Sequence, residues 1–159
     1  MKDTYYELNE RAARSGYVDL VDVEAFREEE RTSEEIRKLQ SAGVHVIASF
    51  HNFDRTPDRE ELIRRLTRMQ EMGADVAKIA VMPQSREDVM TLMEATMEAD
   101  HSLDIPVVTM SMGRLGVLSR LAGTLTGSAM TFASVGEASA PGQIPIEQMR
   151  VFCQLLSMK

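Results

Sequence analysis

Short apolar runs alternate with segments of helical periodicity along this chain, and this alternation limits its possible folds more than any other feature. The runs expected to form strands cover residues 17–24, 44–50, 76–82, 105–112 and 129–134. The segments expected to form helices cover residues 4–15, 32–42, 56–72, 85–97, 116–121 and 146–156. Strands separated by helical segments of about ten to fifteen residues are typical of βαβ units and a parallel sheet.

Capping residues mark the ends of two of these helices. Thr32 followed by Glu35 has the spacing of a capping box, and Gly43 ends the same helix. Ser85 and Asp88 mark the start of a later helix. These signals predict helix boundaries, but they do not choose between the folds that a parallel sheet allows.

The number of strands narrows that choice. A closed (β/α)₈ barrel needs eight strands, and the sequence predicts about five. Five parallel strands form either an open doubly wound sheet or a piece of a barrel, and the pattern alone does not separate these. A dinucleotide-binding sheet is not indicated, because no expected strand is followed by G-x-G-x-x-G.

Composition and charge exclude several classes of function. The 159 residues, 43% of them apolar, suffice for one compact domain with its own core. The net charge is −7 and the basic residues form no run, so a footprint for nucleic acid or anionic lipid is absent. The single cysteine, Cys153, precludes an internal disulfide. No apolar stretch approaches the roughly 20 residues of a membrane span, and no signal-peptide core follows Met1. We expect a cytoplasmic protein.

The most unusual polar residue is Lys78, which lies inside the apolar run of residues 76–81. Lysine is rarely buried without a partner or a purpose. A desolvated amine loses its charge more readily and is then able to attack a carbonyl carbon. On the pattern alone, an edge-strand lysine whose amine reaches the solvent explains Lys78 equally well.

Polar residues also end the two preceding strands. His51 follows the run of residues 44–50, and Asp22 and Glu24 lie in the strand before it. In parallel α/β folds the reactive groups gather at the carboxyl ends of the strands. We expect the His51 imidazole and the Lys78 amine to converge over one substrate, with Asp22 orienting the imidazole. Taken alone, His51 also fits a helix-capping or rim residue.

Two further segments in the second half carry suitable polar groups. Arg120 has apolar neighbours, and its guanidinium is suited to bind a carboxylate through two hydrogen bonds. A surface ion pair is the ordinary alternative. Residues 134–144 form a long loop in which Ser139 offers a hydroxyl and Gln143 an amide. This loop is either a lid over a site or an ordinary connection.

Taken together, five segments resemble the type I 3-dehydroquinate dehydratases over nearly the whole chain. They occur in the family's order, with the lysine in the strand after the histidine. The matching segments are Ser49–Phe53, Ala77–Ser85, Thr109–Gly113, Ser119–Gly123 and Ser139–Gln143. Each is weak alone, and the set is specific.

The resemblance implies a TIM barrel that acts in the shikimate pathway of aromatic amino acid biosynthesis. It implies that Lys78 forms a Schiff base with the ketone of 3-dehydroquinate. His51 would help to form and hydrolyse this imine, and would carry the proton from the carbon beside it to the departing hydroxyl. No metal or diffusible cofactor is implied, because the protonated imine is itself the electron sink.

The same resemblance assigns the substrate-binding residues. Arg120 would hold the substrate carboxylate, and Ser139 and Gln143 would close over the bound molecule. Asp22 matches a family acid on the strand beside the histidine. The remaining pocket-lining residues implied are Met110, Met112 and Phe132.

The departure from the family is at the front of the chain. Nothing in residues 1–16 replaces the family's first strands, which carry substrate-binding arginine and glutamate residues. We therefore expect residues 1–159 to form a single partial barrel domain of about five βα units. Such a fragment would expose open sheet edges, so we expect a homo-oligomer or a partner chain that supplies the other strands.

Two alternatives remain open at this point. The first is a truncated or partner-dependent fragment that binds ligand without turnover. The second is another Schiff-base enzyme, such as an aldolase, for which the same Lys78 chemistry would serve. Arg120, Ser139 and Gln143 argue against the aldolase.

Overall fold

A computed structural model describes the backbone of residues 2–157, and it contains four strands and seven helices in that range. The strands are β1 (Leu20–Glu24), β2 (His45–Asn52), β3 (Val76–Val81) and β4 (Val107–Ser111). The helices are α1 (Lys2–Ala13), α2 (Glu29–Ser41), α3 (Arg59–Glu71), α4 (Arg86–Ser102), α5 (Val117–Leu121), α6 (Gly123–Thr126) and α7 (Ile146–Ser157).

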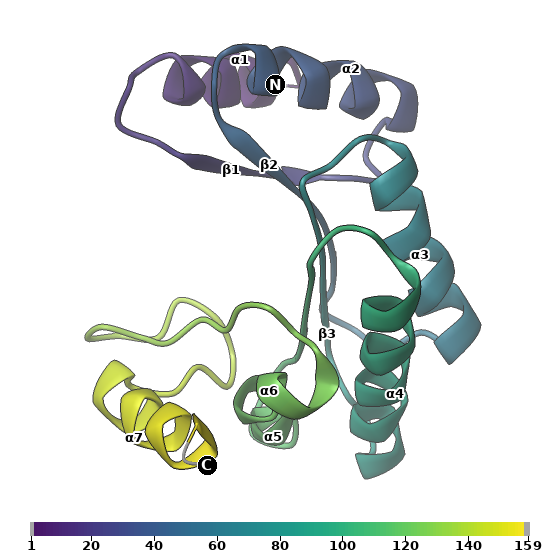
Figure 1. The fold of residues 1–159 in the computed structure, drawn as a ribbon, viewed down its shortest axis with the longest axis vertical. Coiled ribbons are helices and arrows are strands. Elements are labelled where there is room, and N and C mark those ends of the chain that lie inside the picture. Colours follow the sequence, from purple (N-terminus) through teal and green to yellow (C-terminus); the bar gives the residue numbers. More distant parts are fainter. Residues whose placement is uncertain (1, 158–159) are drawn as a thin grey trace.

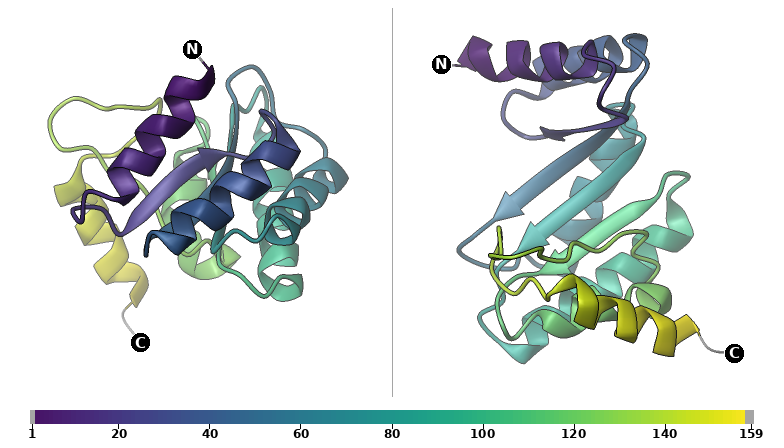
Figure 2. Two further views of the ribbon diagram at one scale, coloured as in Figure 1. Left: turned by 90° about the horizontal axis from the view of Figure 1, so that it is seen from above. Right: turned by 90° about the vertical axis from the view of Figure 1, so that its left-hand side faces the viewer.

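The four strands form one parallel sheet in the order β1-β2-β3-β4, which is also their order along the chain. Helices α1 to α4 lie along the outer side of the curved sheet (Figure 1). Helices α1 and α2 lie side by side over β1 (Figure 2). The predicted parallel α/β fold of partial-barrel type is therefore confirmed.

The side chains of each strand alternate between two apolar layers, because successive residues of a strand point to opposite faces. The larger layer lies between the sheet and its helices and includes Val23, Ala48, Ile79 and Val107. The smaller layer lies on the inner face and is formed by Ile47, Val76, Ala80, Val108 and Met110, with Met130 and Phe132 packed against it. Since both faces are covered in the middle of the sheet, all six residues of β3 are buried.

The expected fifth strand at residues 129–134 is wrong. The Ala129 amide donates to the Val107 carbonyl at 2.8 Å, as a fifth strand would, but the ladder goes no further. An isolated parallel bridge between Ser134 and Pro145 is the only other pairing of this segment within residues 2–157. Strand propensity is local, whereas a strand also needs a neighbour along its whole length.

One of the two expected helix starts is correct. Ser85 caps α4 in a capping box with Asp88. The expected capping box at Thr32 and Glu35 is wrong. Helix α2 already begins at Glu29, so both residues lie within the helix, and both side chains are buried. The acidic run before Thr32 suits a first helical turn, where negative charge faces the positive end of the helix dipole.

Candidate active site

The inner face of the sheet gathers the polar side chains of three strands. Asp22 and Glu24 of β1 share this face because they are two residues apart, and so do Ser49 and His51 of β2. The register places Ser49 between Glu24 on one side and Lys78 of β3 on the other. The parallel strands thus bring two carboxylates, an imidazole and an amine together on the inner face of the sheet.

Lys78 is buried, with 9% of its surface exposed. Its Nζ donates to Asp22 Oδ2 at 2.6 Å, and Ser49 Oγ donates to Asp22 Oδ1 at 2.5 Å. The same Nζ lies 5.1 Å from the centre of the Phe132 ring, within the range of a cation–π interaction. Strand β3 lies between β2 and β4, and the Lys78 amine is paired with Asp22 inside the molecule. Lys78 is therefore not a lysine on an edge strand whose amine reaches the solvent.

His51 is held by a different carboxylate from the one expected. Its Nδ1 is hydrogen-bonded to Glu24 Oε1, and its ring is stacked on that of Phe53 with 6.2 Å between the ring centres. The expected contact of Asp22 with the imidazole is wrong, because Asp22 faces Lys78 and Ser49. Since Glu24 takes Nδ1, the other ring nitrogen, Nε2, remains available for proton transfer.

Arg120 projects from the short helix α5 and is 3% exposed, so it is not a surface ion-pair residue. Its Nη2 donates to the Pro141 carbonyl at 3.1 Å, and its Nη1 lies 3.6 Å from the sulfur of Met110. Within residues 2–157, its Nε has no hydrogen-bond partner. Burial lowers the pKa of the guanidinium below its ordinary value. A buried cation with unmet donors creates a strong preference for an anion beside it.

The loop before α7 folds back over this arginine. The amide and hydroxyl of Ser139 both donate to Gln143 Oε1, at 2.8 and 3.1 Å. The Pro141 carbonyl accepts from the Gly113 amide at 3.1 Å as well as from Arg120. Gly142 has a φ of +78°, and a Cβ there would lie 2.4 Å from the Gly113 carbonyl oxygen. The loop therefore rests directly on the end of β4.

One cavity of about 320 Å³ unites these groups. Its lining residues are His51, Phe53, Lys78, Ala80, Met110, Met112, Arg120, Phe132, Ser139, Ala140, Pro141 and Gln143. All eight residues that the sequence assigned to catalysis or substrate binding line it, and Asp22 lies behind Lys78. The sequence did not assign roles to Glu24 and Phe53. A signal for Glu24 was present in the sequence. Side chains two residues apart in a strand point to the same face, so Glu24 had to share a face with Asp22, nearer the carboxyl end of β1.

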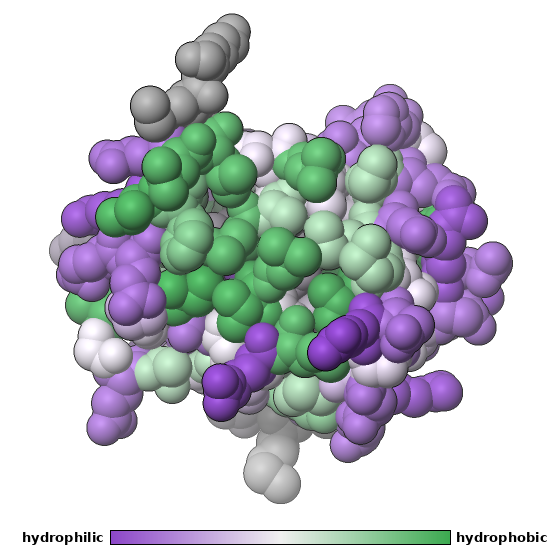
Figure 3. Space-filling view, turned by 90° about the horizontal axis from the view of Figure 1, so that it is seen from below, coloured by the Kyte–Doolittle hydropathy of each residue, from purple (hydrophilic) through white to green (hydrophobic). Residues whose placement is uncertain are grey.

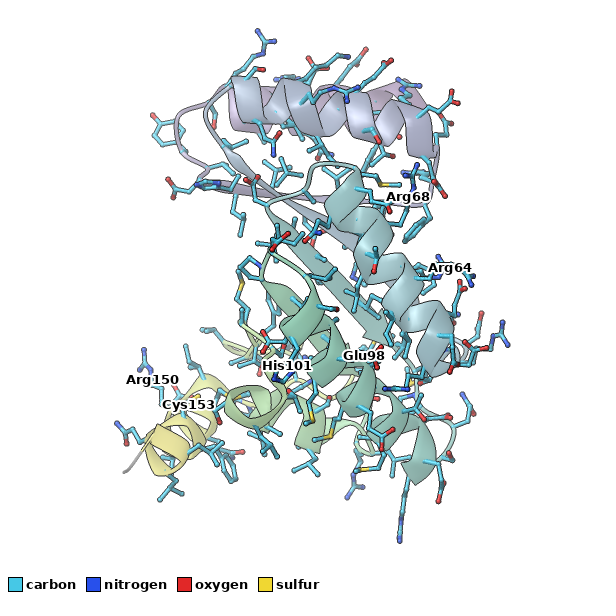
Figure 4. The ribbon with its side chains drawn as sticks, turned by 45° about the vertical axis from the view of Figure 1, so that its right-hand side comes forward. Arg64, Arg68, Glu98, His101, Arg150 and Cys153 are labelled. Carbon is cyan, nitrogen blue, oxygen red and sulfur yellow. The ribbon has the colours of Figure 1, made fainter. Side chains whose placement is uncertain are left out.

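A larger hollow of about 480 Å³ lies between α2 and α3, away from this chemistry. Its arginines are paired with glutamates: Arg68 contacts Glu29 and Glu71, and Arg64 contacts Glu61. Arg64 and Arg68 project outward from α3 (Figure 4). Because these charges satisfy one another at the surface, the hollow gives no sign of a ligand site.

Two negative findings apply to the part of the chain that the structure describes. Within it, no group of three or more His, Cys, Asp or Glu residues is arranged to hold a metal ion. Also within it, no helix is both long enough and apolar enough to cross a membrane.

A buried lysine inside a barrel-type strand, paired with a carboxylate and lining one cavity with a histidine and a buried arginine, is the arrangement expected of a (β/α) barrel protein that forms a Schiff base. The family model for type I 3-dehydroquinase matches residues 1–159, and the chain belongs to that family. It is 51% identical over 152 residues to the 3-dehydroquinate dehydratase of Listeria welshimeri, and 50% identical over 156 residues to that of Klebsiella pneumoniae.

Solved structures agree with this assignment. The type I 3-dehydroquinate dehydratase of Clostridium difficile superposes with a TM-score of 0.93 at 46% identity, covering 98% of this chain and 62% of that one. The Geobacillus kaustophilus enzyme gives a TM-score of 0.94 at 45% identity, covering 98% and 60%. The match to the curated relatives covers 96% and 98% of this chain but only 60% and 62% of their own lengths.

Proposed function

We propose that this chain carries the imine-forming half of a 3-dehydroquinate dehydratase, and that it dehydrates 3-dehydroquinate when the rest of the barrel is present. The observation that carries the proposal is the cavity in which Lys78, His51 and Arg120 meet. An amine, a proton-transfer group and an anion-binding cation are the three groups that a Schiff-base dehydration of a keto acid requires.

The first step is attack of the Lys78 amine on the substrate ketone, with loss of water, to give an imine. Asp22 holds Nζ in place through its 2.6 Å contact, and Ser49 fixes the other carboxylate oxygen. This pairing leaves Asp22 as the nearest acceptor for the proton that the ammonium must release before it attacks.

The second step is the elimination itself. His51 Nε2 takes a proton from the carbon beside the imine, and the electron pair moves into the C–N system as an enamine. The enamine then expels the hydroxyl, which leaves as water with a proton returned by His51, and hydrolysis of the new imine frees the product. Glu24 keeps the proton of the neutral imidazole on Nδ1, so that Nε2 serves as the base.

The other residues that line the cavity bind the substrate. Arg120 pairs with the substrate carboxylate, and the loop groups of Ser139 and Gln143 close over the bound molecule. Apolar side chains exclude water around the ring; these are Met110, Met112 and Phe132. The relative from Clostridium difficile, solved with covalently modified comenic acid, supports a site of this kind.

The direct test is trapping of the imine. Purified residues 1–159 are incubated with 3-dehydroquinate and borohydride, and the modified peptide is identified by mass spectrometry, alongside a dehydratase assay. We expect a reduced adduct on Lys78. An adduct on another lysine, or no adduct at all, would contradict the proposed chemistry, and equal trapping of simple aldehydes would favour an aldolase.

Replacing Gly142 with alanine is expected to leave the fold intact and to weaken substrate binding roughly 10- to 100-fold, the scale of one lost hydrogen bond to a charged group. The new Cβ would lie 2.4 Å from the Gly113 carbonyl oxygen, so the loop moves and carries Ser139 and Gln143 away from the cavity that they line. The measurement is the Kd for 3-dehydroquinate by calorimetry with each variant. Gly136→Ala is the control, since Gly136 also has a positive φ but a Cβ added there would meet no atom within 4 Å. Equal loss in both variants would contradict this account.

We further propose that this chain acts in the cytoplasm, and that the open side of the sheet is covered either by another copy of this chain or by a partner chain that supplies further strands. The relatives are longer than this chain, and an eight-stranded barrel has no open edge. Apolar side chains gather on the lower face, over α5, α6 and α7 (Figure 3). Those that are exposed are Leu118, Leu125, Val151, Phe152, Leu155 and Leu156.

This apolar face is expected to make the chain self-associate. Contiguous apolar patches of this kind mark interfaces. Light scattering coupled to gel filtration, at roughly tens of micromolar protein, should give a mass above that of one chain. Phe152→Glu with Leu155→Glu should shift it toward the monomer, whereas a monomeric parent chain would contradict the proposal.

A further inference from the structure

The outer edge of β1 presents peptide groups without a neighbouring strand. The His45 amide donates to the Asp19 carbonyl at 2.9 Å, and the Ala25 amide donates to the Ser49 carbonyl at 2.8 Å. Alternate residues of a parallel strand point their peptide groups to opposite sides. The peptide groups of Leu20, Asp22 and Glu24 therefore face away from β2, and no strand within residues 2–157 pairs there.

At Glu24 a side chain takes the place of that strand. The hydroxyl of Tyr5, on α1, accepts the hydrogen bond of the Glu24 amide at 3.0 Å. The Tyr5 ring packs against the outer apolar layer, and the Arg27 guanidinium lies over it at 4.9 Å. Both the ring and the hydroxyl of Tyr5 are therefore fixed.

Helix α1 is itself anchored on α2, which gives Tyr5 a firm base. The Arg31 guanidinium lies 4.3 Å from the centre of the Tyr6 ring, and Ala13 of α1 is buried in the same apolar layer as Leu39 of α2. Tyr6 is buried next to Tyr5, with their rings edge to face. These contacts link the outer helices to the last residue of β1.

Glu24 is that last residue, and its side chain is 41% exposed. The end of an edge strand frays readily when its peptide groups are unpaired. An amide anchor at this point therefore controls where the carboxylate that contacts His51 Nδ1 lies.

We propose that Tyr5 is a positioning residue for His51, acting through the Glu24 amide and carboxylate. Its hydroxyl stands in for a strand carbonyl and keeps Glu24 where it holds the imidazole proton on Nδ1. The consequence for catalysis rests on the proposed function of His51, but the positioning does not depend on turnover.

The test compares Tyr5→Phe with Tyr6→Phe in the 159-residue chain. The first variant removes only the hydroxyl that caps Glu24. The second is a matched control, because the buried Tyr6 hydroxyl has no hydrogen-bond partner in the part of the chain that the structure describes. Two signals are read by NMR: hydrogen exchange of the Glu24 amide, and the tautomer of the His51 ring from its ¹⁵N resonances, identified by their loss in His51→Gln. His101, whose Nδ1 contacts the Met97 carbonyl, is a reference in the same spectra.

In Tyr5→Phe we expect Glu24 exchange to accelerate roughly five- to tenfold, the scale of one hydrogen bond. The His51 ring should change from mainly Nδ1-protonated to a mixture of tautomers, while Tyr6→Phe matches the parent chain. An unchanged His51 tautomer in Tyr5→Phe overturns the proposal, even if Glu24 exchanges faster. So does an equal change in both variants. A failed dehydratase assay affects neither measurement and bears only on the proposed function.

Discussion

Replacing Lys78 with methionine is expected to abolish imine trapping while the chain stays folded. Methionine keeps a stem of similar length for the inner layer but has no amine to attack a ketone. Asp22 loses its partner, yet it retains the Ser49 hydroxyl and is partly exposed, so the melting temperature should fall by no more than about 4 °C. The measurement is the adduct yield with 3-dehydroquinate and borohydride, with circular dichroism as the check on folding.

Lys38→Met is the matched control for this experiment. Lys38 lies on α2 with its side chain 58% exposed, and it takes no part in the cavity. It should trap substrate as the parent chain does. If Lys78→Met still formed the adduct, another lysine would carry the chemistry and the assignment of Lys78 would be wrong.

Supplying the absent part of the barrel is expected to raise dehydratase turnover by on the order of 10²-fold or more. Lys78 and His51 suffice for an imine, but elimination also needs the substrate held with the correct hydrogen facing the imidazole. Arg120 fixes one end of the molecule, and the resemblance to the family assigns the groups for the other end to strands that are not present in these 159 residues.

The experiment measures product formation by the purified chain, with and without a second polypeptide that carries the first three βα units of a relative. The control is the same mixture with the Lys78→Met chain, which should remain inactive if the second polypeptide contributes no catalysis of its own. Full activity from the 159-residue chain alone would show either that the front of the barrel is dispensable or that a second copy replaces it.

The local parts of this fold could be predicted because their causes are local. Ser85 and Asp88 are three residues apart, and their reciprocal hydrogen bonds form within one helical turn. Thr32 and Glu35 have the same spacing but lie inside α2, because the preceding acidic residues had already started the helix. Residues 129–134 have the composition of a strand, but a strand also needs a neighbouring strand to pair with. The position of such a neighbour is not encoded in the local sequence, and this segment forms only an isolated bridge in the described part of the chain.

The residues of each strand that share the inner face of the sheet could be read from the amino-acid sequence alone. Successive side chains of a strand point to opposite faces. Once the strands are parallel, the inner face must therefore carry Asp22, Glu24, His51 and Lys78. The order of the family motifs along the chain then assigned Arg120 and residues 139–143 to the same site, but it did not predict the contacts between them.

Which of these groups form pairs, in contrast, depends on how the strands pack in three dimensions. Asp22 bonds to Lys78 across an intervening strand, and Glu24 rather than Asp22 bonds to His51. The outcome depends on the tilt and stagger of neighbouring strands, which shift each side chain along the sheet by several ångströms and arise from the packing of the whole sheet. The contact of Arg120 with the Pro141 carbonyl has the same origin, because a loop 21 residues away must first fold back onto β4.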